Sequence, residues 1–134
     1  MFPLETKSYE AKSLADSLLG NPYLQVESAE LPESGGVYLF RNDANEIVYI
    51  GKARNLKRRI RIDHLSQELG DTMSAFRRSI NKVLGIPFGH EMKSWICSNC
   101  KISFIQIDDP DMRSLVEALL IAAVRSKSLL NHDS

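Results

Sequence analysis

Residues 35–63, GGVYLFRNDANEIVYIGKARNLKRRIRID, decide the fold of this chain. Two short runs within them, 37–40 and 47–50, consist of aliphatic, β-branched and aromatic residues, which favour β-strands. The segment between the runs, 41–46, is rich in Asn and Asp, whose side chains hydrogen-bond the nearby backbone in turns. The stretch therefore predicts a β-hairpin with a long loop, and the second strand is predicted to end at Gly51.

A basic helix is predicted to follow the hairpin. The strand pattern stops after residue 51, and Ala53, Leu56 and Ile60 lie close to helical spacing. If the helix begins near Lys52, then Lys52 and Arg59, seven positions apart (59 − 52), lie on one face about 20° out of register. The other basic residues are predicted to face solvent or a phosphate backbone; they are Arg54, Lys57, Arg58 and Arg61.

Charge is distributed unevenly along the chain. The 134 residues carry 17 basic and 17 acidic side chains, a formal net charge of zero. Residues 41–61 alone carry seven basic and two acidic side chains, a local charge of 7 − 2 = +5. A basic surface on a neutral protein can follow a nucleic-acid backbone. The alternative interpretation is a solvated helix face without a partner.

Composition and length exclude several classes of protein. The length suits one domain, and 43% hydrophobic with 25% charged residues is typical of a globular protein. The first residues, MFPLE, lack the basic and apolar regions of a signal peptide. No apolar stretch reaches the ~20 residues that cross a bilayer. We therefore expect a cytoplasmic protein with no membrane partner.

The two cysteines, Cys97 and Cys100, form a C-x-x-C pair, which is half of a zinc site at most. The missing ligands would have to be His64, His90 or His132, and none of these lies at a recognisable spacing. We therefore interpret the cysteines as small core or turn residues. A zinc-binding interaction domain is the weaker interpretation.

The hairpin is flanked by further elements. Residues 1–30 are predicted to be an N-terminal helical extension that ends near Gly20, and residues 31–134 to be the main domain. The extension packs on that domain or on a second copy of the chain, so a homodimer is one expectation. Downstream, the pattern predicts a helix that is capped by Asp71 or Thr72 and ends at Gly85, with Arg77 outside its apolar stripe. A loop over 86–93, a strand over 102–107 and a helix from about 110 to 125 are predicted to follow.

Three ordered features resemble the GIY-YIG endonuclease family, in particular the nuclease module of the bacterial excision-repair enzyme and small stand-alone members. They are Gly36-Val37-Tyr38, the segment Val48-Tyr49-Ile50-Gly51-Lys52-Ala53, and Arg59 ten positions after Tyr49 (59 − 49). The resemblance covers roughly residues 31–131. It implies a mixed α/β (α+β) fold with a small three-stranded antiparallel sheet flanked by helices. It also implies hydrolysis of DNA phosphodiester bonds in DNA repair or recombination.

A non-catalytic nucleic-acid-binding module with the same fold is the alternative, and RNA stays open as a substrate. The resemblance implies a catalytic set of Tyr38, Tyr49, Lys52, Arg59, Glu117 and Asn131. From the residues alone, Glu117 is an acid in an apolar helix, and it is either paired with Arg113 or Arg125 or functional. The resemblance implies that it binds a metal, Mg²⁺ or Mn²⁺, which prefer oxygen ligands.

The two tyrosines lie on neighbouring predicted strands, where aromatic residues usually belong to the core. A phenol has an ordinary pKa near 10, which Lys52, Arg59 and a divalent cation would lower. A tyrosine could then take a proton from water while Lys52 and Arg59 hold the phosphate. Which of Tyr38 and Tyr49 does so is left open.

Two positions depart from the repair-enzyme pattern. Asn131 follows Glu117 by fourteen positions (131 − 117), two more than that pattern has. The pattern also has a further tyrosine fourteen positions after the second motif tyrosine, and here that position is Asp63, followed by His64. His64 could replace this tyrosine as a base or phosphate contact, but we interpret it as an ordinary histidine at a helix end.

Overall fold

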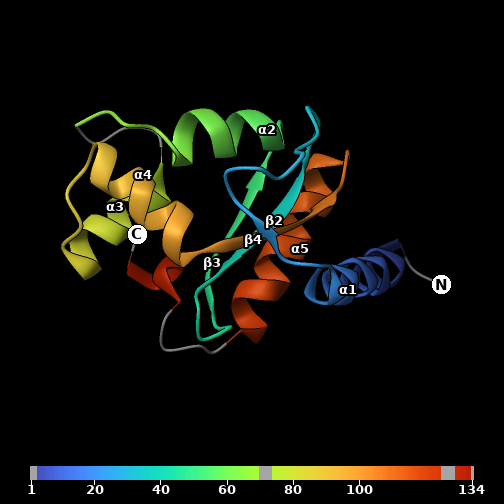
Figure 1. Cartoon of the computed structure of the whole chain (residues 1–134). Coiled ribbons are helices and arrows are strands. Elements are labelled where there is room, and N and C mark those ends of the chain that lie inside the picture. Colours follow the sequence, from blue (N-terminus) through green and yellow to red (C-terminus); the bar gives the residue numbers. More distant parts are fainter. Residues whose placement is uncertain (1–2, 70–73, 125–128, 134) are drawn as a thin grey trace.

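The computed structural model of the protein describes residues 3–69, 74–124 and 129–133 (Figure 1). It is a mixed α+β fold in which helices cover both faces of an antiparallel sheet with the strand order β1-β4-β2-β3. The elements in chain order are α1 (Pro3–Gly20), β1 (Leu24–Gln25), β2 (Gly36–Arg41), β3 (Ile47–Ala53), α2 (Leu56–Arg58), the π-helix η1 (Arg59–His64), α3 (Ala75–Leu84), α4 (His90–Asn99), β4 (Lys101–Gln106), α5 (Pro110–Ala123) and the 3₁₀-helix η2 (Leu130–Asp133).

The predicted hairpin is confirmed. Strands β2 and β3 pair with Tyr38 opposite Gly51, and β4 pairs with the other side of β2. In the loop, the Asn42 side chain accepts hydrogen bonds from the backbone N–H groups of Ala44 and Glu46, both at 3.0 Å. The predicted fold class is confirmed, but the sheet has a fourth strand, because two residues of β1 pair with β4. Strand β3 lies at the edge of the sheet.

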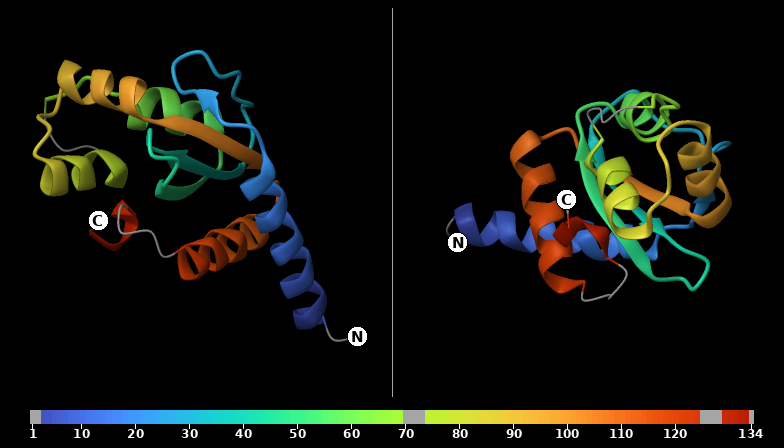
Figure 2. Two further views of the ribbon diagram at one scale, coloured as in Figure 1. Left: turned by 60° about the horizontal axis from the view of Figure 1, so that its bottom comes forward. Right: turned by 90° about the vertical axis from the view of Figure 1, so that its left-hand side faces the viewer.

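Alternate residues of the strands face two separate cores. Tyr38, Phe40 and Tyr49 face α2, α3 and α4, whereas Val37 and Leu39 face α1 and α5. Figure 2 shows the two groups of helices on opposite sides of the sheet. Helix α1 therefore packs against α5 of its own domain, which answers the question of where the N-terminal helix lies. Within the described ranges, none of the helices is both long and apolar enough to cross a membrane.

Strand β3 is longer than predicted. It continues through Lys52 to Ala53, and the helix begins only at Leu56, where the side chain of the N-cap Asn55 accepts a hydrogen bond from Arg58 N. Gly51 and Ala53 are buried and Lys52 between them is exposed, which is the alternation of a strand with one buried face. The prediction that Lys52 and Arg59 share one helix face is therefore wrong.

The helices after η1 also differ in part from the prediction. Gly85 ends α3 in the left-handed conformation, as predicted, but the N-cap is Ser74; Asp71 and Thr72 lie outside the described residues. The predicted loop over 86–93 ends at Gly89, because α4 begins at His90 and runs to Asn99. Buried Met92 and Ile96 form only a narrow apolar stripe on this helix, among many polar residues. Cys97 therefore lies on a helix and packs against the core, and Cys100 is buried in that core, as the interpretation of the cysteines as core residues predicted.

Gly51 is predicted to be essential for stability because it leaves room for the ring of Tyr38. A Cβ atom at Gly51 would lie 2.3 Å from both Cζ and Oη of Tyr38, whose side chain is fully enclosed. We expect Gly51→Ala to lower the free energy of unfolding by about 1–3 kcal/mol, the usual cost of overpacking a core. Chemical denaturation measures this, with Gly20→Ala as control, because a Cβ there would contact nothing within 4 Å. Equal stability of both variants would contradict the explanation.

Candidate active site

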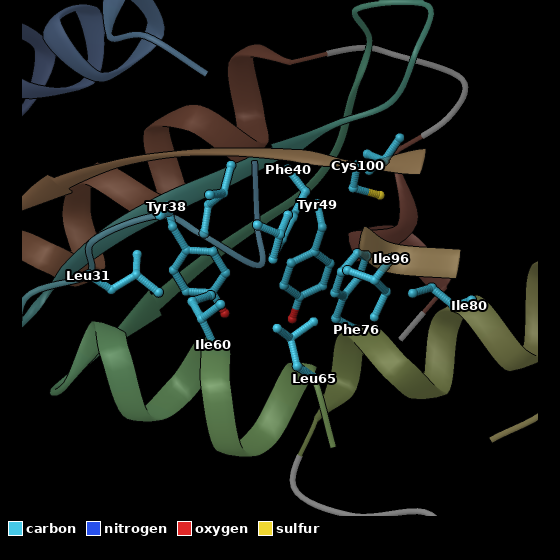
Figure 3. Close-up of a cluster of buried hydrophobic side chains, with 14 of the residues drawn as sticks. Leu31, Tyr38, Phe40, Tyr49, Ile60, Leu65, Phe76, Ile80, Ile96 and Cys100 are labelled. Carbon is cyan, nitrogen blue, oxygen red and sulfur yellow. The ribbon is translucent and has the colours of Figure 1, made fainter. Parts of the chain in front are cut away.

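The two motif tyrosines lie next to each other in the core between the sheet and helices α2 to α4 (Figure 3). Their ring centroids are 6.4 Å apart, and Tyr38 and Tyr49 are 1% and 8% exposed. Burial is the largest influence and raises the pKa of both phenols above the ordinary 10. Arg59 lowers both pKa values, as expected, but burial outweighs it.

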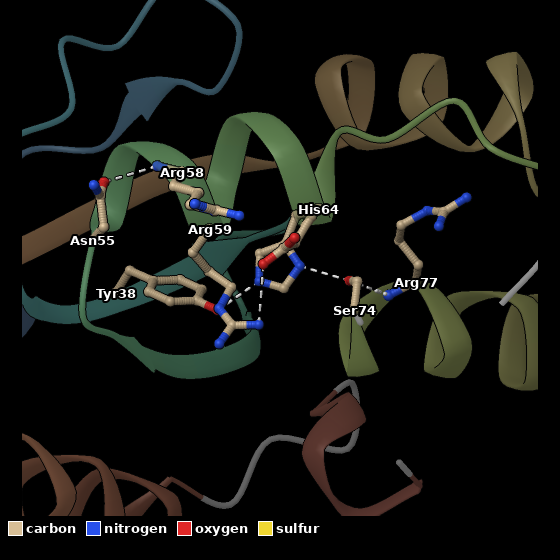
Figure 4. A network of polar contacts seen from close by, with 8 residues as sticks. Tyr38, Asn55, Arg58, Arg59, His64, Ser74 and Arg77 are labelled. Carbon is tan, nitrogen blue, oxygen red and sulfur yellow. Dashed lines mark hydrogen bonds and ion pairs between the residues drawn. The ribbon is translucent and has the colours of Figure 1, made fainter. Parts of the chain in front are cut away.

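Tyr38 belongs to a buried polar chain (Figure 4). Its Oη is hydrogen-bonded to His64 Nε2 at 2.5 Å, and His64 Nδ1 is hydrogen-bonded to Ser74 Oγ at 2.6 Å. Ser74 Oγ also accepts a hydrogen bond from Arg77 N at 3.0 Å, as the N-cap of α3. Burial, with smaller contributions from Arg59 and Arg77, lowers the pKa of His64 from 6.5 to about 3. His64 does end a helix, as interpreted from the sequence, and it is buried with both ring nitrogens hydrogen-bonded.

The π-helix explains why His64, rather than Asp63, reaches Tyr38. Leu65 N donates to Ile60 O at 3.0 Å, five residues earlier, so this turn contains one residue more than an α-helical turn. The side chain that points at Tyr38 is thereby moved from position 63 to position 64. Asp63 instead forms an ion pair with Arg59 at 3.2 Å. The only sequence signal for this arrangement was a histidine one position beyond the place of the expected tyrosine.

A cationic pocket of about 340 Å³ lies between the end of β3, η1 and the first turn of α5. Lys52 comes from β3 and Arg59 from η1, so the structure brings these two predicted residues together by a different route from the predicted one. Lys52 Nζ donates to Ser114 Oγ on α5 at 2.8 Å. The lining has four cationic side chains and no carboxylate; it consists of Lys52, Ala53, Arg54, Arg59, Pro110, Arg113 and Ser114. Such a pocket suits a phosphate group.

Arg113 is the most buried cation of this pocket and was not predicted as part of it. It is 7% exposed, and its guanidinium donates to the carbonyl oxygens of Ile107 at 3.1 Å and Asp108 at 3.0 Å. These two hydrogen bonds hold the guanidinium against Gly35, where a Cβ atom would clash with it. The suggested ion pair between Arg113 and Glu117 is not among the contacts of the described residues, and Arg125 lies outside them.

Glu117 is half-buried on α5. Burial raises its pKa, and Lys52 lowers it, while its charge in turn raises the pKa of both Tyr38 and Tyr49. Glu117 is thus coupled electrostatically to both tyrosines and to Lys52. Within residues 3–69, 74–124 and 129–133, no three His, Cys, Asp or Glu side chains form a group that could hold a metal. A metal here would have Glu117 as its carboxylate ligand.

Asn131 supports the open edge of β3. Its side-chain Oδ1 accepts from Ile50 N at 2.8 Å, and its Nδ2 donates to Ile50 O at 2.7 Å. This pair of hydrogen bonds is the kind that a neighbouring strand would make with the edge strand. Because Ile50 lies between Tyr49 and Gly51, the amide fixes the strand at the position of the second motif.

The predicted outer row of basic residues is only partly exposed. Arg54 and Arg58 are exposed, and exposed Lys57 lies 3.7 Å from Glu33. Arg61 is half-buried and lines a pocket with Lys57 and Arg58, but its guanidinium donates to the carbonyl oxygens of Val26 at 2.5 Å and Ala29 at 2.6 Å. Arg61 is thus only partly exposed, and it anchors the segment before β2.

Arg77 is likewise not on the surface of α3. Its side chain is fully buried, donates to Glu68 O at 2.6 Å and lies over the ring of Phe88, with Cζ 5.0 Å from the centroid. Arg77 does lie outside the apolar stripe of this helix in the sequence, as predicted, but this position does not make it exposed. In the folded chain the guanidinium is enclosed by the segment that precedes α3 and by the loop that follows it.

Comparison with known proteins shows which family the chain is similar to. The model of the UvrC-like GIY-YIG domain matches residues 34–103, just over half of the 134 residues. UvrABC system protein C of Alkaliphilus oremlandii is 64% identical over 38 residues, which are 28% of this chain and 6% of that protein. The same protein of Gloeobacter violaceus is 50% identical over 46 residues, 34% of this chain and 7% of that protein. This chain thus matches only a small part of the length of these relatives.

Among solved structures, the GIY-YIG N-terminal endonuclease domain of UvrC from Thermotoga maritima, bound to its catalytic magnesium, resembles the chain. It is 24% identical, with a TM-score of 0.45, and the match covers 73% of this chain and 85% of that chain. Glu117 and Asn131 lie beyond the residues that the family model matches.

Proposed function

The chain belongs to the UvrC-like GIY-YIG domain family, and on this basis we propose that it is a metal-dependent endonuclease that hydrolyses phosphodiester bonds in DNA. One observation carries the proposal. The rings of Tyr38 and Tyr49 lie 6.4 Å apart, Glu117 raises the pKa of both, and Arg59, which lowers both pKa values, lines a pocket with Lys52 and no carboxylate. A proton acceptor, phosphate-binding cations and a metal-binding carboxylate are groups that together can catalyse metal-dependent hydrolysis of a phosphodiester.

In the proposed mechanism the DNA backbone enters the cationic pocket, where Lys52 and Arg59 hold the scissile phosphate. Ser114 orients Lys52 through their 2.8 Å hydrogen bond. Arg59 is presented at the entrance with Asp63 at 3.2 Å, so the phosphate competes with that carboxylate for the guanidinium. These contacts place the phosphorus atom next to the tyrosines, where an attacking water can be deprotonated.

We assign the proton acceptor to Tyr38 rather than Tyr49. The buried polar chain through His64 and Ser74 ends on the hydroxyl group of Tyr38. For the Tyr49 hydroxyl, in contrast, none of the contacts among the described residues is a hydrogen bond. A base must be held in one position and have its charged form stabilised, and Tyr38 has the partners for both.

The donor set fits magnesium or manganese. Mg²⁺ is commonly held by one or two carboxylates and completes its shell with water and substrate phosphates. Glu117 supplies one half-buried carboxylate whose pKa is raised by burial, so a nearby cation would favour its ionised form. When bound, the metal would supply positive charge for the leaving oxygen. Asn131 holds β3 and has no proposed contact with the reacting atoms.

A non-catalytic binding module is the second candidate, and a cleavage assay separates the two. The protein is incubated with linear duplex, branched DNA and single-stranded RNA, each with Mg²⁺ or with EDTA. We expect cleavage of DNA only with Mg²⁺. Binding without cleavage of any substrate would favour the binding module. The excision-repair system of the UvrC relatives makes DNA repair the proposed context.

Arg54 and Arg58 are predicted to contact DNA phosphates. Each phosphate contact on B-DNA contributes a slope of about −0.9 to the dependence of log K on log salt. We expect Arg54→Gln and Arg58→Gln each to reduce the slope by about 0.9, alike for all sequences, as measured by fluorescence anisotropy between 50 and 200 mM salt. Lys101→Gln is the control, because exposed Lys101 lies at the opposite end of β4 from the pocket. An unchanged slope in the double variant would show that DNA lies elsewhere.

A further inference from the structure

The buried chain of Tyr38, His64 and Ser74 has a direction that can be determined by counting protons. His64 is neutral near pH 7, since its pKa is lowered to about 3, so only one of its two ring nitrogens carries a proton. The two hydrogen bonds must therefore run the same way along the chain. Either Tyr38 donates to Nε2 and Nδ1–H donates to Ser74, or Ser74 donates to Nδ1 and Nε2–H donates to Tyr38.

Ser74 decides between the two directions. Its side chain is fully buried, and its oxygen already accepts from Arg77 N. Among the described residues, His64 Nδ1 is the only hydrogen-bond partner of Ser74 Oγ that can accept a proton. If His64 donated to Ser74, the hydroxyl proton of Ser74 would be buried without an acceptor, which is costly. The N–H groups at the start of α3 also favour a serine oxygen that turns its lone pair toward them and its proton away.

The opposite direction leaves only the proton of Tyr38 at the end of the chain. That proton then lies on the buried hydroxyl of Tyr38, the group that must give up its proton in the proposed reaction, whereas no proposed step removes the proton of Ser74. We therefore infer that Ser74 donates to Nδ1 of His64 and that His64 donates through Nε2–H to the hydroxyl oxygen of Tyr38. His64 is thus a positioning residue that stabilises the phenolate of Tyr38, and it does not act as a base.

This inference rests on the proposed function for its consequence in the reaction. Tyr38 first gives up its own proton to a water molecule that enters the site. Its phenolate then accepts a proton from the attacking water as the water oxygen bonds to phosphorus and the phosphorus–oxygen bond to the leaving strand breaks, and the leaving oxygen takes a proton from solvent. His64 keeps its single proton throughout. A hydrogen bond to the charged form of a group favours that form, so Nε2–H offsets part of the burial that raises the pKa of Tyr38. The neighbouring charged groups, Arg59 and Arg77, both oppose protonation of His64.

Long-range ¹H–¹⁵N NMR of the histidine rings tests the direction without any assay of activity. The spectrum is recorded on the whole metal-free chain at neutral pH, with His90, on the exposed surface of α4, as an internal comparison. We expect His64 to carry its proton on Nε2. A proton on Nδ1 would overturn the inference, whether or not the protein cleaves DNA.

Two variants of Ser74 test the cause. Ser74→Gly removes the hydroxyl donor but costs a helix N-cap only a few tenths of a kcal/mol, whereas Ser74→Thr keeps both donor and cap. In Ser74→Gly we expect a measurable population with the proton on Nδ1 and a shift of the pH–rate profile for cleavage to higher pH. In Ser74→Thr we expect the tautomer of His64 and the pH–rate profile to match those of the wild type. If folded Ser74→Gly keeps the wild-type tautomer of His64, the role of Ser74 is contradicted. If the tautomer changes but the wild-type protein cleaves no DNA, only the proposed function is contradicted.

Discussion

Replacement of Glu117 by glutamine should reduce magnesium-dependent DNA cleavage by about 10²-fold or more and leave DNA binding intact. Loss of a metal or of a comparably strong electrostatic stabiliser typically costs this much in rate. The substitution nearly preserves shape and removes the charge that would bind the metal. The basic surface of Arg54 and Arg58 is untouched, so binding measured in EDTA should equal or exceed that of the wild type.

The control for this variant is Asp111→Asn, which removes an exposed carboxylate from the first turn of the same helix. We expect the control to cleave at the wild-type rate. Thermal melts on the same preparations should show that Glu117→Gln is as stable as the wild type or more so, because a neutral amide replaces a half-buried acid whose pKa is raised by burial. A destabilised but active Glu117→Gln would contradict the metal assignment and make Glu117 a structural residue.

Tyr38→Phe should abolish most of the cleavage, with a rate loss of about 10² to 10⁴, the usual contribution of general acid–base catalysis. Tyr49→Phe should cost less, since its hydroxyl does not take part in the polar chain of His64 and Ser74. Single-turnover rates at saturating Mg²⁺ measure both. A greater loss of cleavage rate in Tyr49→Phe than in Tyr38→Phe would show that Tyr49, and not Tyr38, is the proton acceptor.

Folding controls are needed for Tyr38→Phe. The variant keeps the ring that packs against Gly51 but leaves Nε2 of His64 without its hydrogen-bond partner, while Nδ1 keeps Ser74. We expect a lower melting temperature and an unchanged salt dependence of DNA binding, because the phosphate contacts lie on other residues. Loss of binding together with cleavage would show that the variant had lost its fold rather than its base.

Local patterns predicted the elements whose periodicity is regular. The hairpin, the strand at β4 and the final helix each combine a clear apolar pattern with turn or cap residues, such as Asn42 or Asp109. Tyr38, Tyr49 and Glu117 could be singled out because the motif spacing was preserved. Their approach to one another follows from strand pairing and from the packing of α5 against the sheet.

Features that depend on tertiary contacts could not be predicted. A two-residue strand has no pattern, and α4 has too narrow an apolar stripe to be separated from a loop. The π-turn at η1 has no sequence rule, yet it decides that His64 faces Tyr38. Arg113 and Ser114 join Lys52 in one pocket only after the chain has folded, because about sixty residues separate them in sequence.

The most direct test of the central claim is nicking of supercoiled plasmid by the wild type and by Glu117→Gln, each in EDTA and after restoration of Mg²⁺. The account predicts nicking only by the wild type and only with Mg²⁺, lost again when EDTA is added. Nicking that persists in EDTA, or equal nicking by Glu117→Gln, would contradict it.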